Sequence, residues 1–176
     1  MVAIVTGNGL GLSGSSANVL GSGGQIGVAG TGVGGDSAYV NAQTGNLVIQ
    51  RQDELLIGRG PDIGIVRTYN SLGGVDFDNN DNCQISLYRQ LSGLTGGSGV
   101  NTVGSKITRT GADGAQLAYT YDAATGKYIN KDGGGSYDTL TFANNTWTWE
   151  DGDSRIKETY EASGTGLWRI KNVTDP

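Results

Sequence analysis

The chain has 176 residues, of which 32 are glycine, 2 are proline, 1 is cysteine and none is histidine. Each glycine inside a helix costs about 1 kcal/mol relative to alanine, so this composition disfavours helix and predicts an all-β fold. The lack of histidine excludes Ser-His-Asp and Cys-His catalysis, and a single cysteine excludes an internal disulfide. The formal net charge of −5 disfavours nucleic acid and anionic membranes as partners.

The first 35 residues differ in composition from the rest of the chain. They contain no charged side chain and include 12 glycines, whereas residues 36–176 have the mixed charge of a globular β-protein. We therefore expect two parts: a glycine-rich leader or plug at 1–35, which is either flexible or packed as strand and turn, and a β-rich domain at 36–176. The opening residues lack the features of a classical signal peptide, and no apolar run is long enough to span a membrane.

The start of the leader imitates a dinucleotide-binding fold. A short apolar run precedes Gly7, Gly9 and Gly11, but the G-x-G-x-x-G spacing would require glycine at position 12, where Leu12 stands. The glycine-rich segment that follows is also a poor helix former, and such a site needs a helix to bind phosphate. The sequence therefore argues against a nucleotide site.

Residues 38–70 read as strands separated by turns. Alternation is clearest where Ile63, Ile65, Arg67 and Tyr69 share one face of a strand. An arginine on an apolar face needs a partner if it is buried, and we expect Arg67 to pair with Asp53 or, alternatively, with Glu54 on the preceding strand. Arg67, Asp53 and Tyr69 are thus the predicted structural residues of this region.

The segment 76–82 is the densest group of oxygen ligands. Alternate positions hold Asp76, Asp78, Asn80 and Asn82, a spacing at which calcium loops present side chains. An EF-hand is excluded, because that loop also needs a central glycine and a closing glutamate. A simple surface calcium site and a polar turn both remain possible interpretations, and no other cofactor is indicated.

A weak repeat runs through the second half of the chain. The dipeptide Asp-Gly recurs at 113, 132 and 151, each time 19 residues apart, and apolar or aromatic residues at spacing two lie between. Asp-Gly is typical of type I′ hairpin turns, in which both central residues have positive φ. The pattern predicts stacked antiparallel β-hairpins.

Two groups in this half carry competing functional interpretations. Glu150, Asp151 and Asp153 resemble a glycosidase carboxylate pair, but such clusters are common in hairpin turns. The three tryptophans are suited either to stacking on sugar rings or, more commonly at spacing two, to core packing: Trp147, Trp149 and Trp168.

The last strand-like run, 167–173, has no capping helix. Stacked hairpins leave unpaired backbone groups at their edges, which proteins normally cover. We expect these edges to pair with further repeats of a longer protein or with other copies of this chain.

Several segments resemble the N-terminal region of Rhs/YD-repeat proteins. The resemblance lies in 40–49 (VNAQTGNLVI), with an acidic residue shortly after it at Asp53, and in 65–71 (IVRTYNS). Segments 119–127 (YTYDAATGK) and 166–176 (GLWRIKNVTDP) are similar to a YD repeat and to the end of such a region. A departure occurs after 65–71, where Asn82 and Cys83 replace the family's usual Gly-Trp pair.

The resemblance implies a role in architecture. Such proteins wind a ribbon of β-hairpins into a shell, often around a toxin domain, or act at cell surfaces, and this region carries none of their catalytic residues. We therefore expect a non-catalytic structural part of a secreted or cell-surface protein, the leading piece of a longer chain. The alternative is an extracellular β-domain that binds glycan or calcium for adhesion; an enzyme is the least favoured class.

Overall fold

The computed structural model describes residues 2–30, 35–57, 63–73, 81–131 and 137–176. The chain forms two compact units. Unit 1 comprises Met1–Tyr88 and Gly111–Gln116, and unit 2 comprises Arg89–Thr110 and Leu117–Pro176. The division thus falls after Tyr88, whereas the composition changes at residue 35.

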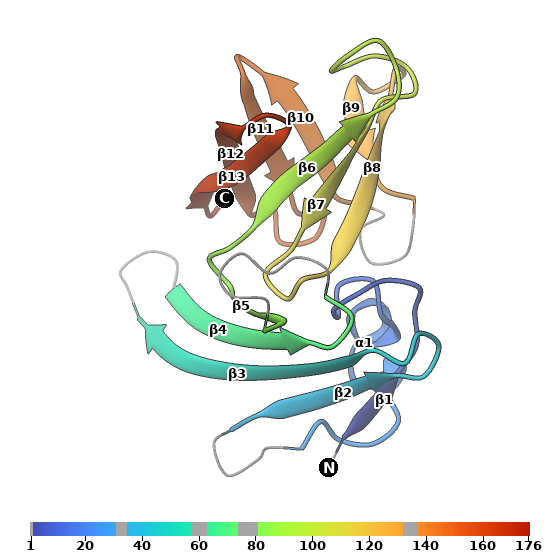
Figure 1. Cartoon of the computed structure of the whole chain (residues 1–176), viewed down its shortest axis with the longest axis vertical. Coiled ribbons are helices and arrows are strands. Elements are labelled where there is room, and N and C mark those ends of the chain that lie inside the picture. The colour runs from blue at the N-terminus through green and yellow to red at the C-terminus, as the bar shows by residue number, and fades with distance from the viewer. Residues whose placement is uncertain (1, 31–34, 58–62, 74–80, 132–136) are drawn as a thin grey trace. The chain divides into compact units, whose positions relative to one another are not determined.

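Unit 1 is built on a five-stranded sheet in the order β1-β2-β3-β4-β5 (Figure 1). The pairing of β1 with β2 is parallel, and the other pairs are antiparallel. The strands are β1 (Ala3–Val5), β2 (Ser37–Asn41), β3 (Leu47–Leu56), β4 (Ile63–Asn70) and β5 (Cys83–Ile85).

The described part of the leader is folded into unit 1. After β1 the chain forms a one-turn helix, α1 (Ser16–Leu20), and a 3-10 turn, η1 (Gly21–Gly24). The backbones of Ile4 and Ile26 then exchange two hydrogen bonds of 2.9 Å. The described residues of 1–35 thus include a strand, a short helix and a hydrogen-bonded bridge.

Glycine in the leader permits close backbone approach. Gly11 has a φ of +70°, and a Cβ built on it would lie 2.7 Å from Oδ2 of Asp113 and 2.8 Å from the backbone nitrogen of Ala115. The neighbouring amide of Leu12 donates a hydrogen bond to the same Asp113 oxygen. The leader thus packs against the turn 111–116 of its own unit at a distance that only glycine allows.

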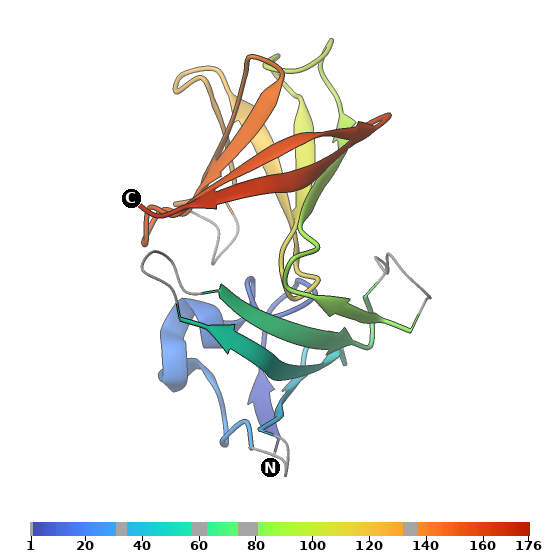
Figure 2. The ribbon, with the colours of Figure 1, turned by 90° about the vertical axis from the view of Figure 1, so that its left-hand side faces the viewer.

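Unit 2 is a closed barrel of eight strands in the order β10-β11-β12-β13-β6-β7-β8-β9 (Figures 1 and 2). Its strands are β6 (Gln90–Thr95), β7 (Lys106–Thr110), β8 (Gln116–Asp122), β9 (Lys127–Ile129), β10 (Thr139–Ala143), β11 (Thr146–Glu150), β12 (Lys157–Gly164) and β13 (Leu167–Thr174). The all-β prediction is confirmed.

The arrangement of the hairpins differs from the predicted open stack. Strand β13 pairs with β12 on one side and with β6 on the other, where Trp168 lies opposite Leu91. The prediction of an open edge is wrong for 167–169, which pair with β6, and the backbone N–H of Ile170 adds a hydrogen bond to the carbonyl of Arg89, because a barrel satisfies its edges by closing on itself. The pairing of β10 with β9 contributes to the same closure.

The turn chemistry also differs from the prediction at two of the three Asp-Gly dipeptides, 113–114 and 151–152, while Asp132-Gly133 lies outside the described residues. At Asp113-Gly114 only the glycine has positive φ (+77°), so this is not a type I′ turn. The two-residue connection between β10 and β11 is Asn144-Asn145, with φ values of 51° and 62°, as type I′ requires. Asparagine tolerates this conformation better than most residues, so the I′ signal was present in the sequence in a different dipeptide.

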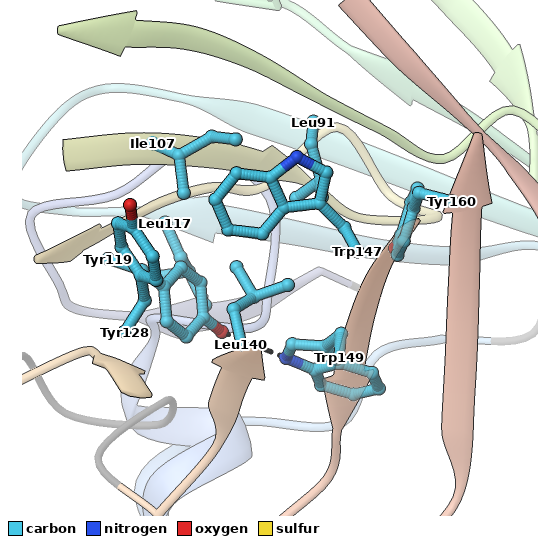
Figure 3. Packing of buried hydrophobic residues seen from close by; sticks show 9 residues of the cluster. All are labelled: Leu91, Ile107, Leu117, Tyr119, Tyr128, Leu140, Trp147, Trp149 and Tyr160. Atoms are coloured by element: carbon cyan, nitrogen blue, oxygen red, sulfur yellow. Dashed lines mark hydrogen bonds between the residues drawn. The ribbon is translucent and has the colours of Figure 1, made fainter. Parts of the chain in front are cut away.

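Aromatic side chains fill the barrel (Figure 3). The rings of Tyr128 and Trp147 pack edge to face, with centroids 5.0 Å apart. The core cluster comprises Leu91, Ile107, Leu117, Tyr119, Tyr128, Leu140, Trp147, Trp149 and Tyr160. The period-two alternation seen in the sequence brings these residues to one side of each strand, and closure turns that side inward.

Within the described part of the chain, no helix has the length and apolar character needed to cross a membrane.

Replacement of Gly11 by alanine tests the close approach to the turn 111–116. We expect Gly11→Ala to lower the free energy of unfolding by about 2–4 kcal/mol, through the strain of positive φ and the clash. The matched control is Gly45→Ala: Gly45 has a φ of +74° but nothing within 4 Å of its Cβ position, so only the strain of about 1 kcal/mol remains. Equal losses in chemical denaturation would contradict the contact.

Candidate functional site

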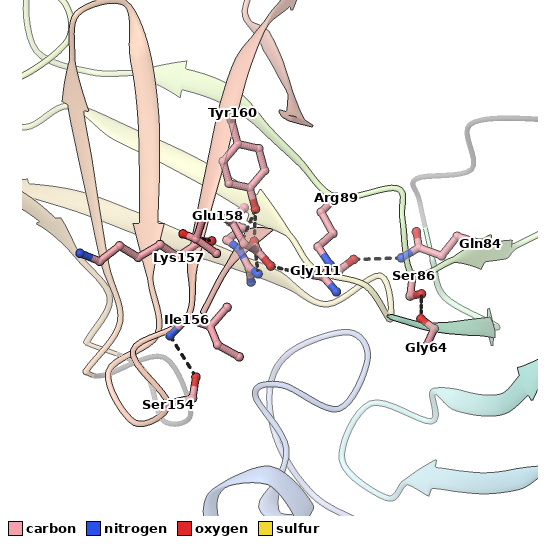
Figure 4. A network of polar contacts seen from close by, with 12 residues as sticks. Gly64, Gln84, Ser86, Arg89, Gly111, Ser154, Ile156, Lys157, Glu158 and Tyr160 are labelled. Atoms are coloured by element: carbon pink, nitrogen blue, oxygen red, sulfur yellow. Dashed lines mark hydrogen bonds and ion pairs between the residues drawn. The ribbon is translucent and has the colours of Figure 1, made fainter. Parts of the chain in front are cut away.

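A buried charge network in the barrel is the strongest concentration of ionisable groups in the described residues. Arg109 lies in β7, and Glu158 and Tyr160 lie two residues apart in β12, so alternation points both β12 side chains to the barrel interior. Arg89 immediately precedes β6. Figure 4 shows Arg89, Glu158 and Tyr160 converging on one another.

Glu158 is the centre of this network. Its Oε2 accepts hydrogen bonds from Nη2 of Arg109 at 2.7 Å and from Nε at 3.3 Å, as well as one from the hydroxyl of Tyr160. Its Oε1 accepts a hydrogen bond from Nη1 of Arg89. The side chain of Glu158 is only 2% exposed, against 9% for Arg109 and 25% for Arg89. Both carboxylate oxygens are therefore used by protein donors.

A second row of contacts extends the network across the barrel. The guanidinium carbon of Arg109 lies 3.7 Å from the ring centre of Trp149, within the range of a cation–π contact. Nε1 of Trp149 donates to the hydroxyl of Tyr119 at 3.1 Å, and this hydroxyl approaches Oδ2 of Asp138 at 3.4 Å. The other carboxylate oxygen of Asp138 accepts the backbone N–H of Gly152 at 3.0 Å.

The electrostatics keep this network in one protonation state at neutral pH. Burial alone would raise the pKa of Glu158, but the guanidiniums of Arg109 and Arg89 outweigh burial and hold that pKa below its ordinary value. Burial raises the pKa of Tyr119 and of Tyr160, so both stay protonated. An ionised carboxylate between two permanent cations is neither a good proton donor nor a good acceptor. Chemically, the arrangement is suited to holding strands together.

The structure brings the predicted structural pair together. Nε and Nη2 of Arg67 donate to the two carboxylate oxygens of Asp53 at 3.0 and 2.7 Å. The pair forms although the arginine is not buried: the Arg67 side chain is 54% exposed and that of Asp53 28%. Water screens such a pair, so it contributes little to stability. Tyr69, on the same strand face, is half-buried opposite Ile49.

The predicted calcium ligands lie mostly outside the described residues. This holds for Asp76, Asp78 and Asn80, whereas Asn82 is described. Asn82 has a positive φ of 61°, and its carbonyl accepts the backbone N–H of Asn70 at 2.9 Å. Among the described residues, no group of three or more Asp, Glu, Cys or His side chains could hold a metal ion.

The acidic turn after β11 has a local structural role. Glu150 lies 3.5 Å from Arg155 and 3.8 Å from Lys157. The Asp151 carboxylate accepts the backbone N–H of Asp153 at 2.9 Å. These carboxylates order a turn, in agreement with the preferred interpretation.

The core interpretation of the tryptophans is confirmed for two of the three. Trp147 is fully buried and Trp149 is 7% exposed. Trp168 is half-buried, and its ring centroid lies 5.8 Å from that of Trp147. Neither Trp147 nor Trp149 is accessible for stacking on a sugar ring.

The segments that carry the family resemblance are tied together by asparagine side chains. Asn46 is fully buried, and its Oδ1 accepts the hydroxyl of Ser71 and the backbone N–H of Leu72, both at 3.1 Å. Asn41 bridges in the other direction, donating from Nδ2 to the carbonyl of Gly7 at 2.9 Å. Asparagine and serine in 40–49 and 65–71 thus connect the β2–β3 turn to the leader and to the end of β4.

The YD-like segment forms the hairpin between β8 and β9. The rings of Tyr121 and Tyr128 pack with centroids 5.2 Å apart across the two strands. Asp122 orders the turn, because its Oδ2 accepts the hydroxyl of Thr125 at 2.8 Å. Gly126 takes the positive φ of 69°. Tyr121, Asp122, Thr125 and Gly126 of this motif therefore have roles within one hairpin.

Sequence reasoning missed the charge network. A signal was nevertheless present: Arg109 follows Ile107 at spacing two, and Glu158 precedes Tyr160 at the same spacing. Opposite charges at positions otherwise reserved for core residues indicate a buried ion pair. Only the pairing of distant strands identifies the partners, since Arg109 and Glu158 are 49 residues apart.

Two known proteins resemble a short part of the chain. No family model matches the chain. Over 40 residues the chain is 45% identical to the tRNA nuclease WapA of Bacillus subtilis (strain 168). It is equally similar to the tRNA(Glu)-specific nuclease WapA of Bacillus subtilis subsp. natto (strain BEST195). The match covers 23% of this chain but only 2% of either nuclease.

Neutralising Glu158 should remove a pH-dependent part of the stability. We expect Glu158→Gln to cost about 3–5 kcal/mol near neutral pH, because it leaves buried arginine charge unpaired. The pKa of Glu158 is lower in the folded state than in the unfolded chain. The stabilisation by its carboxylate is therefore fully present above the ordinary pKa of 4.5 and is lost as the pH falls through the folded-state pKa. The difference in free energy of unfolding between wild type and Glu158→Gln, measured by denaturation at several pH values, should therefore become smaller in acid.

The matched control is Glu161→Gln, in the same strand. Glu161 pairs with Lys171, but its side chain is 52% exposed, so a near-neutral effect is expected. A gap between Glu158→Gln and wild type that stays constant down to strongly acidic pH would contradict the assigned role of the carboxylate.

Truncating Asn46 tests the tie between the two motif segments. We expect Asn46→Ala to cost about 1–3 kcal/mol, because the backbone N–H of Leu72 and the hydroxyl of Ser71 lose their buried acceptor. Asn172→Ala serves as the control, since Asn172 is exposed on β13. Thermal denaturation of both variants decides the question, and similar melting temperatures for the two would count against the tie.

Proposed function

We propose that this chain is a non-catalytic structural segment of a larger secreted or cell-surface protein of the Rhs/YD-repeat kind. In that protein it would serve as a shell, plug or assembly segment, with the remaining repeats as its partners. No resident cofactor is needed for such a role.

The observation that carries the proposal is that the reactive side chains of the barrel bind to one another inside it. Glu158, the most buried carboxylate, is held by two arginines and a tyrosine. Tyr119, Tyr128, Tyr160, Trp147 and Trp149 lie in the core. In such a barrel the polar and aromatic side chains hold the strands together, which is what a structural segment requires.

Two further observations support it. The residues behind the family resemblance have structural roles, since Asn46 joins two segments and Asp122 orders a hairpin turn. The short match is to proteins much longer than this chain, because the same 40 residues are 23% of one and 2% of the other. Those relatives are named as tRNA nucleases, and so small a share of them is compatible with a non-catalytic part.

The alternative is an extracellular domain that binds calcium or glycan for adhesion. Its calcium form is favoured by the spacing of oxygen ligands at Asp76, Asp78, Asn80 and Asn82. Its glycan form is weakened, because Trp147 and Trp149 are buried in the barrel.

Assays of the purified chain separate these functions. As a structural segment, the chain should leave tRNA intact, bind no immobilised glycan and give no calorimetric heat with calcium. Nuclease activity that stays with the folded chain through purification would refute a non-catalytic role. Calcium binding that is abolished in Asp76→Asn and Asp78→Asn, but kept in Asp81→Asn, would favour the adhesion alternative.

Deletion in the longer protein tests the structural role directly. Removing residues 2–176 should reduce the yield of folded, protease-resistant protein while leaving the activity of each folded molecule unchanged. A normal yield with reduced activity per molecule would instead indicate a functional site in this chain.

A further inference from the structure

The sheet of unit 1 carries apolar residues on both of its faces. An antiparallel sheet with one solvated face normally turns polar residues outward. Here the buried side of the strands holds Ala3, Val5 and Val48 and also polar residues, Asn41, Thr68, Asn70 and Gln84, all at most 7% exposed. The more exposed side carries mainly apolar residues. Such a distribution indicates that the second face is also meant to be covered.

The strand register shows that the apolar residues form one continuous surface. Ile4 lies opposite Val40, which lies opposite Leu47, and one step along, Ile49 lies opposite Tyr69. Paired residues in neighbouring strands point to the same side of a sheet. We call the surface formed by Ile4, Val40, Leu47, Ile49, Tyr69 and Ile85 the apolar face.

The exposure of this face is consistent with an uncovered surface. Ile4 is 42% exposed, and its bridge partner Ile26 is 74% exposed. The other members of the apolar face are partly exposed, whereas their neighbours in sequence Val48 and Thr68 are 2% and 0% exposed. Alternate residues of the same strands thus differ sharply in burial.

The charges at one end of the apolar face restrict the choice of partner. Arg51 lies opposite Arg67 in the register, and both side chains are about half exposed. Asp53 pairs with each arginine, at 3.7 Å and 2.7 Å, and Asp36 lies 3.9 Å from Arg51. Together with the exposed Glu54, which lies opposite Ile65 on the same face, this end carries charges of both signs.

We propose that the apolar face binds the apolar face of a second copy of this chain, sheet against sheet. In a two-fold dimer the same patch occurs on both subunits, so the patch must be complementary to itself. An uncharged centre and an end with charges of both signs meet this condition, since an arginine of one copy can face a carboxylate of the other. A nucleic acid or an anionic membrane would instead require an excess of positive charge.

The geometry of a sheet also suits this partner. Two sheets that pack face to face lie about 10 Å apart with strands about 30° from parallel, and their inner side chains interdigitate. Branched and aromatic residues such as Ile49 and Tyr69 form such layers. The inference depends on the apolar face alone and does not depend on the structural role proposed above.

The first test measures the mass of the chain in solution. In reducing buffer, which prevents Cys83 from cross-linking copies, the weight-average mass by sedimentation equilibrium should rise from 18.2 kDa towards twice that value with increasing concentration. Ile49→Asp should weaken the association about a hundredfold or more, because it buries a charge between the sheets. Val103→Asp, at a residue 76% exposed in unit 2, should leave the association unchanged.

The second test needs no variant and therefore does not depend on the folding of Ile49→Asp. Cys83 pairs with Tyr69 on the same side of the sheet and is partly exposed. Its alkylation by a maleimide should slow as the protein concentration rises, because dimerisation covers it.

Three outcomes would overturn the proposal. The first is a monomer at all concentrations, with a rate of Cys83 alkylation that does not depend on protein concentration. If Cys83 then reacts slowly at every concentration, a segment of the same chain covers the apolar face. The second is a dimer that Ile49→Asp, shown to be folded by circular dichroism, leaves intact, which would place the interface elsewhere. The third is association with a different protein by a chain that does not bind itself.

Discussion

Closure of the barrel is the constraint on which the rest of unit 2 depends. The pairing of β13 with β6, together with that of β9 with β10, turns a run of hairpins into a cylinder with a single interior. Every residue at an inward position then loses its access to water at once. Aromatic residues gain from this, whereas Arg109 and Glu158 are tolerated only because they pair inside. The fold and the charge network are therefore consequences of the same closure.

The two units satisfy their polar groups in different ways. In the barrel, one carboxylate is held by two guanidiniums and a tyrosine hydroxyl around Glu158. In unit 1 neutral amides contribute beside the buried carboxylate of Asp113: Asn41, Asn46 and Asn70 each connect a strand or its turn to a distant segment. Neutral amides cost less to bury than charges, so they are tolerated on the covered face among Ala3, Val5 and Val48. The opposite face is mainly apolar, and a further layer is expected there.

Part of the candidate site could be predicted from sequence. The ion pair of Arg67 with Asp53 followed from their positions on adjacent strands, but its exposure did not, because alternation shows which residues share a face and not which face is covered. The pairing of Arg109 with Glu158 could not be predicted from the sequence, for a different reason. These residues lie on β7 and β12, which are not neighbours in the barrel, so no local pattern relates them.

The sequence by itself determined the all-β class and the spacing of two between the aromatic residues, because these depend on local backbone preference and on a period of two. Only the tertiary structure decided that the hairpins close into a barrel, that Asn144-Asn145 forms the type I′ turn and that the leader packs against the turn at Asp113. The physical reason is that closure and covering involve residues far apart in the chain. Their free energy comes from burial and hydrogen bonds that no short segment contains.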